Sequence, residues 1–243
     1  MFHVLLAVIY IAFISLGLPD ALLGSAWPVM YREFGVSVSY AGIISMIIAL
    51  GTVVSSLQSD RLTKKFGTGR VTAASVALTA FALFGFSLAH SFYALVFLAL
   101  PYGLGAGSVD ASLNNYVALH YKSRHMSWLH CMWGVGAAAG PYVMGFVLAH
   151  GNTWNAGYRA IAVLQTALTA LLVFSLPLWK RNDKNDAAER ISGAAQVSVS
   201  DIRPSVPKTT EPSAFDSEDT RPLSLKEIIN LPGAKTVMLS FFC

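Results

Sequence analysis

The segment GLGAGSVDASLNNY, residues 103–116, places an aspartate and two asparagines beside one of the most apolar stretches of the chain. Hydrophobic residues make up 54% of the sequence and charged residues only 12%, against about 25% charged residues in soluble domains. Of the 13 acidic residues, only Asp20, Glu33, Asp60 and Asp110 precede Lys180. This composition predicts a membrane protein over residues 1–180.

Six apolar stretches are long enough to cross a bilayer, whose core of about 30 Å needs roughly 20 helical residues. They are residues 3–30, 38–58, 71–89, 92–118, 127–149 and 157–179. We therefore expect an all-α integral membrane protein in which residues 1–180 form a bundle of six transmembrane helices.

The connections carry basic residues mainly on one side of the predicted bundle. Only Arg32 and Arg159 fall on the other side. Because cytoplasmic loops hold an excess of Lys and Arg, we expect a multi-pass protein of the plasma membrane with a cytoplasmic N-terminus. The net charge of +4 comes from short loops without interleaved aromatic residues, which does not indicate a nucleic-acid partner. The basic side holds Arg61, Lys64, Lys65, Arg70, Lys122 and Arg124.

The chain changes character after the sixth stretch. Residues 181–222 contain one aromatic residue, several prolines and mixed charge, which predicts a disordered cytoplasmic linker. Ser224 and Glu227 have the spacing of a helix-capping box, so residues 223–243 are expected to start a seventh helix. Its apolar run ends at Cys243 after about 12 Å of rise, too short for a bilayer, and we expect the chain to be a fragment of a longer protein.

Motifs for enzymatic chemistry are missing from the sequence. It contains no HExxH pair and no glycine-rich phosphate loop ending in Lys-Ser or Lys-Thr. The two cysteines, Cys131 and Cys243, have no metal-binding spacing. We expect neither an enzyme nor a bound metal or cofactor.

Two aspartates lie inside predicted spans, Asp20 in the first and Asp110 in the fourth. An ionisable group there costs at least about 2.5–3.5 kcal/mol and usually marks a solute or proton pathway. Both lie in a Gly-x-x-Asp-Ala pattern, at residues 17–21 and 107–111, which are three spans apart. This offset predicts a 3+3 inverted repeat with the aspartates near the midplane. We interpret both as proton-coupling groups; alternatively, each caps a broken helix or bonds a hydroxyl.

Further polar residues lie near these acids. Asn114 follows Asp110 by one helical turn, on the same face, and its amide suits the reading of solute hydroxyls; hydrogen bonding between helices is the alternative. In the fifth span, His130 and Trp133 are candidates for substrate binding, although a structural histidine fits equally well.

A small-residue pattern follows in the same span, Gly136-x-x-x-Gly140-Pro141. Small residues at this spacing let the backbones of two membrane helices approach closely. We expect helix packing there.

The segment SSLQSDRLTKKFGTGRV, residues 55–71, resembles the signature loop of the major facilitator superfamily. It departs from that signature at Ser56, where a glycine is usual, and at the late Gly67. The resemblance implies the N-terminal half of a 12-helix fold, completed by a C-terminal six-helix half. It also implies a gating charge relay at Asp60, Arg61, Lys65 and Arg70. A solvated basic turn that only fixes topology is the alternative.

Within that superfamily, GLGAGSVDASLNN and LHCMWGVGAAAGP, residues 103–115 and 129–141, are similar to the fucose:proton symporter family. This resemblance implies proton-coupled symport of a sugar or similar small polar solute, with Asp20 and Asp110 as its sugar-binding and proton-coupling acids. The pair Gly140-Pro141 also resembles a motif of drug:proton antiporters, so efflux is an alternative. A six-span protein without transport activity is another.

Overall fold

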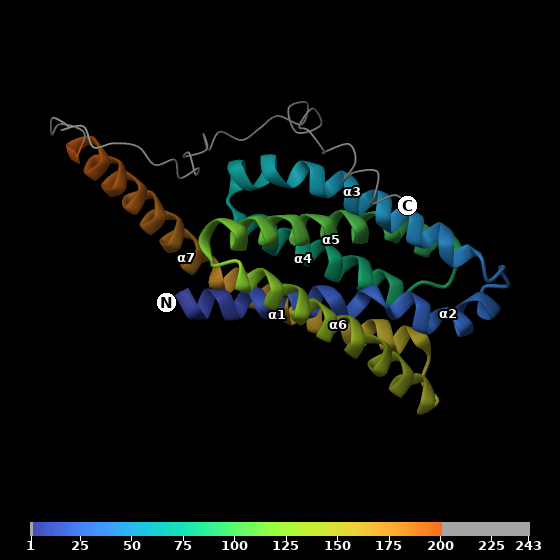
Figure 1. The fold of residues 1–243 in the computed structure, drawn as a ribbon. Coiled ribbons are helices and arrows are strands. Elements are labelled where there is room, and N and C mark those ends of the chain that lie inside the picture. Colours follow the sequence, from blue (N-terminus) through green and yellow to red (C-terminus); the bar gives the residue numbers. More distant parts are fainter. Residues whose placement is uncertain (1, 201–243) are drawn as a thin grey trace, which may run out of the picture. The chain divides into compact units, whose positions relative to one another are not determined.

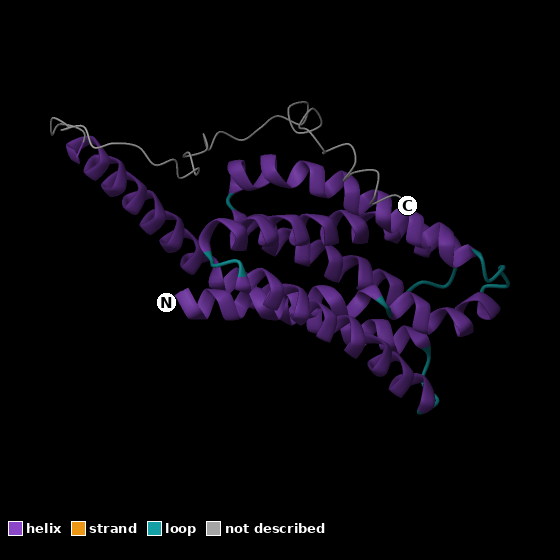
Figure 2. Ribbon diagram, viewed as in Figure 1, coloured by secondary structure: helices purple, strands orange, loops and turns teal. Residues whose placement is uncertain are grey.

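The computed structural model describes residues 2–200, with side chains over residues 4–179. All regular elements in this part of the chain are helices joined by short loops (Figure 2). They are α1 (Phe2–Asp20), α2 (Leu22–Glu33), α3 (Tyr40–Phe66), α4 (Thr68–Ser87), α5 (Phe92–His120), α6 (Arg124–Ala149) and α7 (Trp154–Ser200).

The predicted all-α membrane class is confirmed. Among the residues that the structure describes, six helical segments are long and apolar enough to cross a membrane, and each overlaps one predicted span. They are Val4–Glu33, Tyr40–Phe66, Thr68–Ser87, Phe92–His120, Arg124–Ala149 and Trp154–Trp179.

The first span is interrupted and consists of α1 and α2. The helix breaks at Ala21, which has φ −98° and ψ 0°. Pro19 lies inside α1, two residues before the break. A proline lacks the N–H of the helical hydrogen-bond ladder and crowds the preceding turn. Pro19 therefore weakens the last turn of α1, which ends at Asp20.

The segment 55–71, which the sequence presents as a loop, is mostly helical. Helix α3 continues through Phe66, and Gly67 alone connects it to α4. Gly67 has φ +85°, a conformation that glycine adopts at no steric cost. The polar residues after Gln58 end the apolar run but include good helix formers such as Lys64 and Lys65. Polarity thus ends the membrane span without ending the helix.

Helix α7 also extends further than expected. It runs to Ser200, into the segment 181–222 predicted as a disordered linker. The extension contains Ala, Glu, Lys and Arg and precedes Pro204, which favours continuation of the helix. The rest of the predicted linker and the expected helix start at 223–243 lie outside the described residues. The division into a bundle, a linker and a seventh helix stays a prediction.

Packing among the helices matches the predicted repeat. Helix α5 packs along α3 and α4, whereas α1 packs along α6 (Figure 1). In order of spans, these contacts pair the fourth span with the second and the first with the fifth. The second and fourth spans each have an equivalent three spans away, namely the fifth and the first. The first pair therefore corresponds to the second pair under the predicted repeat. Both pairs therefore have the relation expected of a 3+3 repeat.

The contact between α1 and α6 is made through backbone. A Cβ atom on Gly136 would overlap the carbonyl oxygen of Ile14, and one on Gly140 would overlap that of Leu18. Both glycines are buried. Only glycine lets the two backbones approach this closely, so this seam fixes the position of α6 on α1.

The contact between α5 and α3 is built in the same way. A Cβ atom on Gly103 would overlap the carbonyl oxygen of Ile48, and one on Gly107 would overlap that of Thr52. Ser55 of α3 adds hydrogen bonds to the carbonyl oxygen of Leu104 and to the hydroxyl of Ser108.

Buried polar contacts fix α7 against the first span. Gln165 of α7 donates from Nε2 to the carbonyl oxygen of Ser15 at 2.9 Å. The Ser15 hydroxyl donates to Oε1 of the same glutamine. At one end of the bundle, Trp154 donates from Nε1 to Glu33 Oε2 at 2.6 Å. These bonds join the first and sixth spans, which are far apart in the sequence.

Gly136→Ala should destabilise the protein by about 1–3 kcal/mol, because the added methyl group forces α6 away from the backbone of α1. The measurement is the thermal unfolding midpoint of the protein in detergent. Gly134→Ala is the matched control on the same helix, since a Cβ atom at Gly134 meets nothing within 4 Å. Equal midpoints for the two variants would contradict the packing role of Gly136.

Candidate functional site

Both intramembrane aspartates border one cavity of about 400 Å³. Helices α1, α3, α5 and α6 contribute its walls, so it lies where the two glycine seams bring the helices together. We call it the first cavity. Its lining residues are Leu16, Asp20, Ile48, Thr52, Tyr102, Ala106, Asp110, His130 and Trp133.

Asp20 is held by aromatic donors from two other helices. Tyr102 of α5 donates from its hydroxyl to Asp20 Oδ1 at 3.1 Å, and Trp133 of α6 donates from Nε1 to Oδ2 at 2.9 Å. The aspartate is the last residue of α1, directly before the break. Both carboxylate oxygens of Asp20 therefore have a hydrogen-bond donor.

Asp110 has a different environment in the same cavity. Its Oδ1 accepts a hydrogen bond at 3.0 Å from Nδ2 of Asn114, one turn later on α5. The amide oxygen of Asn114 is buried and has no hydrogen-bond partner among the described residues. Asn114 is not one of the residues that line the first cavity. Its predicted role as a reader of solute hydroxyls stays a prediction, whereas its contact with Asp110 is direct.

The structure brings the two candidates of the fifth span to the same wall. Both His130 and Trp133 line the first cavity. The His130 ring stands edge-on to Phe13, with 6.2 Å between ring centroids. Trp133 is 39% exposed, so part of its ring remains open to a ligand. Substrate binding by these two residues stays a prediction.

Tyr102 is a site residue that sequence reasoning missed. It lies in an apolar part of α5, where an aromatic residue is most simply explained by packing. Tyr102 is 4% exposed and stacks on Phe86 at 6.2 Å between ring centroids. Only the fold reveals that its hydroxyl meets Asp20, because the two residues are 82 positions apart.

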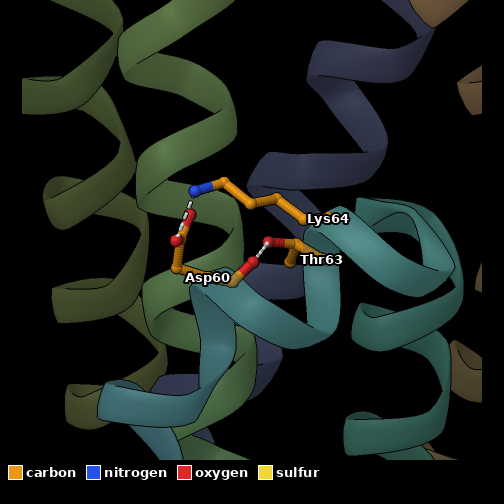
Figure 3. A network of polar contacts seen from close by, with 3 residues as sticks. All are labelled: Asp60, Thr63 and Lys64. Carbon is orange, nitrogen blue, oxygen red and sulfur yellow. Dashed lines mark hydrogen bonds and ion pairs between the residues drawn. The ribbon is translucent and has the colours of Figure 1, made fainter. Parts of the chain in front are cut away.

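The predicted gating residues lie at the ends of two helices. Asp60, Arg61 and Lys65 are on α3, and Arg70 is on α4. Figure 3 shows Asp60 paired with Lys64, with 2.7 Å between Oδ2 and Nζ. Lys64 was not among the predicted relay residues, although its i,i+4 spacing from Asp60 is the signal for such a pair.

This ion pair is exposed and local. Its two side chains are 60% and 59% exposed, and exposed pairs contribute about 0–1 kcal/mol. Thr63 donates from its hydroxyl to the carbonyl oxygen of Asp60 at 3.0 Å. Lys65 lies over the ring of Phe66 instead. A charge relay among the four predicted residues stays a prediction.

The three residues predicted for helix packing differ in their surroundings. Gly136 and Gly140 lie in the seam against α1, as described above. Pro141 is partly exposed within α6 and borders an apolar groove that also includes Ala160 of α7. Its packing role stays a prediction.

The first cavity contains groups of the kinds that bind polar solutes and transfer protons. Its polar groups are two carboxyl groups, the indole N–H of Trp133, the imidazole of His130 and the hydroxyls of Tyr102 and Thr52. Apolar side chains form the rest of the wall. Small-molecule sites are usually of this kind, mostly apolar with a few polar groups that fix orientation. Carboxyl groups and imidazoles inside membranes also serve in proton relays.

The sequence is similar to several known proteins, two of which are named as transporters. The 4-hydroxybenzoate transporter PcaK of Pseudomonas putida is 24% identical over 222 residues, which cover 87% of this chain and 47% of that protein. The glucose/mannose transporter GlcP of Bacillus subtilis is 22% identical over 167 residues, or 68% of this chain and 42% of that protein. The bypass of stop codon protein 6 of Saccharomyces cerevisiae is 28% identical over 149 residues, or 60% and 30%.

The chain spans less than half the length of these three relatives. The family profile of the major facilitator superfamily matches residues 9–243, which is nearly the whole chain. The six apolar helices found here agree with that match. The protein is therefore a multi-pass membrane protein that belongs to the major facilitator superfamily.

Proposed function

We propose that this chain forms the N-terminal half of a secondary active transporter that takes up a sugar or a similar small polar solute together with protons. The observation that carries the proposal is the shared cavity of Asp20 and Asp110, which come from different helices. Two acids on one cavity allow a solute and a proton to bind at neighbouring points. The other half of the solute pathway would come from a C-terminal bundle of six helices.

Asp110 is the proposed proton carrier, because Asn114 can partner both of its protonation states. The Asn114 amide donates to the carboxylate in the structure. Its oxygen, which is buried and has no hydrogen-bond partner in the described part of the chain, would accept the proton of a neutral carboxyl group once the amide turns over. The carboxyl group could then gain and lose a proton without leaving a buried charge or hydroxyl unpaired.

Asp20 is the proposed solute partner. Its two oxygens already accept hydrogen bonds from Tyr102 and Trp133, and such donors stabilise the carboxylate form. Each carboxylate oxygen can accept a further hydrogen bond. Asp20 can therefore bind a solute hydroxyl while it remains charged. Trp133 and His130 would contact the same solute from α6.

The charges of the cavity favour a neutral solute. No Lys or Arg is found among the described residues that line the first cavity. An anion such as 4-hydroxybenzoate, named in one relative, would meet two acidic side chains without a cationic partner. A neutral hexose, as in the name of another relative, avoids this repulsion. This choice agrees with the resemblance to the fucose:proton symporter family.

The proposal includes an orientation and a gate. We place the protein in the plasma membrane, with the N-terminus and the segment 181–222 in the cytoplasm, from the distribution of basic residues. Asp60, Arg61, Lys65 and Arg70 would then lie at the cytoplasmic face. The Asp60–Lys64 pair lies within α3 and is exposed, so it breaks at low cost and would leave Asp60 free to pair with a residue of another helix.

Asp110→Asn should abolish uphill uptake driven by a pH gradient and leave downhill counterflow at least partly intact, because only the proton carrier is removed. The measurement is uptake of labelled hexose into vesicles that contain the full-length protein. Asn115→Ala, which alters an exposed neighbour on α5, is the control and should retain both activities. Unchanged accumulation by Asp110→Asn would remove the proton-carrier role.

Counterflow with labelled solutes tests the solute class. We expect exchange of a hexose and little exchange of 4-hydroxybenzoate or of an apolar cationic drug. The preferred solute should also raise the thermal unfolding midpoint, since it binds the folded state. Exchange of the drug alone would favour proton-coupled efflux. Absence of any solute effect on exchange or stability would favour a six-span protein without transport activity.

A further inference from the structure

A tyrosine and a histidine meet at one end of the contact between α1 and α6. The Tyr10 hydroxyl lies 2.8 Å from Nδ1 of His125. Both side chains are half-buried, and His125 is the second residue of α6. The pair adjoins the connection that carries Lys122, on the predicted cytoplasmic side. Neither residue lines the first cavity, so this contact is separate from the solute site.

One face of α1 leads from this pair to the first cavity. Residues on that face lie three or four positions apart. Phe13, one turn beyond Tyr10, meets the ring of His130 on α6. Asp20 lies two turns further along the same face. The contact between α1 and α6 therefore places one histidine, His130, at the cavity and another, His125, at the cytoplasmic end.

Asp110 and His130 stand where a proton would leave the cavity. Both residues line it, and they are close enough to interact electrostatically. His130 is exposed, so water reaches its ring. A proton that leaves the neutral carboxyl group of Asp110 therefore finds a base in the same cavity.

His125 is the next histidine of α6 towards the predicted cytoplasmic side. It precedes His130 by five residues, which is about 7.5 Å along the helix axis. This gap is too long for direct transfer and matches a chain of about two water molecules. Ordered waters bridge polar groups at little cost. A proton can therefore move between the two imidazoles through water.

The hydrogen bond between Tyr10 and His125 fits both charge states of the imidazole. A tyrosine hydroxyl can donate or accept. It donates to Nδ1 of a neutral ring and accepts from the N–H at Nδ1 of a charged ring. Nε2 takes no part in this bond and is the atom where a proton enters or leaves. Histidine is the side chain best suited to such exchange near neutral pH.

The groups around His125 do not hold a proton there. Arg124 precedes it on α6 and acts electrostatically on the Tyr10 hydroxyl. Lys122 belongs to the adjoining connection, and the ring of Tyr121 is edge-on to the imidazole, with 5.8 Å between centroids. Among the described residues, no acidic side chain forms an ion pair with His125. An ion pair would hold the imidazole in its charged form.

We propose that Tyr10 and His125 form a proton-exchange pair, which takes up the proton released from Asp110 and passes it to cytoplasmic water. The proton leaves the neutral carboxyl group, moves through His130 and water to Nε2 of His125, and then enters bulk water. This restores the carboxylate and both neutral imidazoles. Tyr10 is a positioning residue that holds the His125 ring. The inference rests on the proposed function, because it takes Asp110 as the proton carrier.

Transport by the full-length protein in vesicles tests the pair. His125→Ala removes the imidazole, whereas Tyr10→Phe removes only the hydroxyl that holds it. His150→Gln is the control, because His150 is an exposed histidine at the opposite end of α6. Uphill uptake of labelled hexose driven by a pH gradient is compared with downhill counterflow, each with and without added imidazole.

We expect His125→Ala to lower the initial rate of uphill uptake about ten-fold or more, as for the loss of a general base. Counterflow should be unchanged, because exchange of loaded carriers needs no proton release. Added imidazole should restore part of the uphill uptake, since it supplies the missing base. Tyr10→Phe should lower uphill uptake about two- to ten-fold, the value of one hydrogen bond. His150→Gln should retain both activities.

Each other result overturns a defined part. Unchanged uphill uptake by His125→Ala would refute the exchange pair and leave the proposed function standing. Equal loss of uptake and counterflow, without rescue by imidazole, would assign His125 a structural role and also refute the pair. Unchanged uptake by Tyr10→Phe would refute the positioning role of Tyr10. Uphill uptake that survives Asp110→Asn, or its absence in the unmodified protein, would count against the proposed function and this inference together.

Discussion

Two seams of glycine hold α1 against α6 and α5 against α3, and the position of every site residue follows from them. Hydrocarbon gives apolar helices little reason to associate, so close packing and interhelical hydrogen bonds must do so. At Gly136 and Gly103 the partner's carbonyl oxygen occupies the space of a side chain. With the backbones in contact, Trp133 of α6 and Tyr102 of α5 both reach the carboxylate at the end of α1.

The break after Asp20 converts that close packing into a binding geometry. A continuous helix would leave the carboxyl group on one face of a regular cylinder. Here α1 ends at Asp20 and α2 begins at Leu22, as in transporters whose discontinuous helices surround a midplane site. Donors from two neighbouring helices satisfy both carboxylate oxygens. The cost of placing an acid in the membrane is thereby reduced without pairing it to a cation.

Asp20 and Asp110 have different partners, and this difference underlies their proposed roles. Asp20 receives two fixed aromatic donors, whereas Asp110 receives one amide whose oxygen remains free of partners in the described part of the chain. Fixed donors favour one charge state, and an amide that can present either end serves two. Two acids with similar sequence surroundings are thus distinguished by the helices that face them.

The sequence by itself determined the six spans and the positions of the two intramembrane acids, because apolar length and the rarity of buried charge are properties of each segment alone. It also indicated the repeat that relates the first three spans to the last three. It did not place Tyr102 beside Asp20, and it did not show that α3 continues through Phe66. Those features depend on which helix faces which, and on how far a polar helix extends beyond the bilayer. Only the tertiary structure decided them, because a contact between residues 82 positions apart has no signal in local composition.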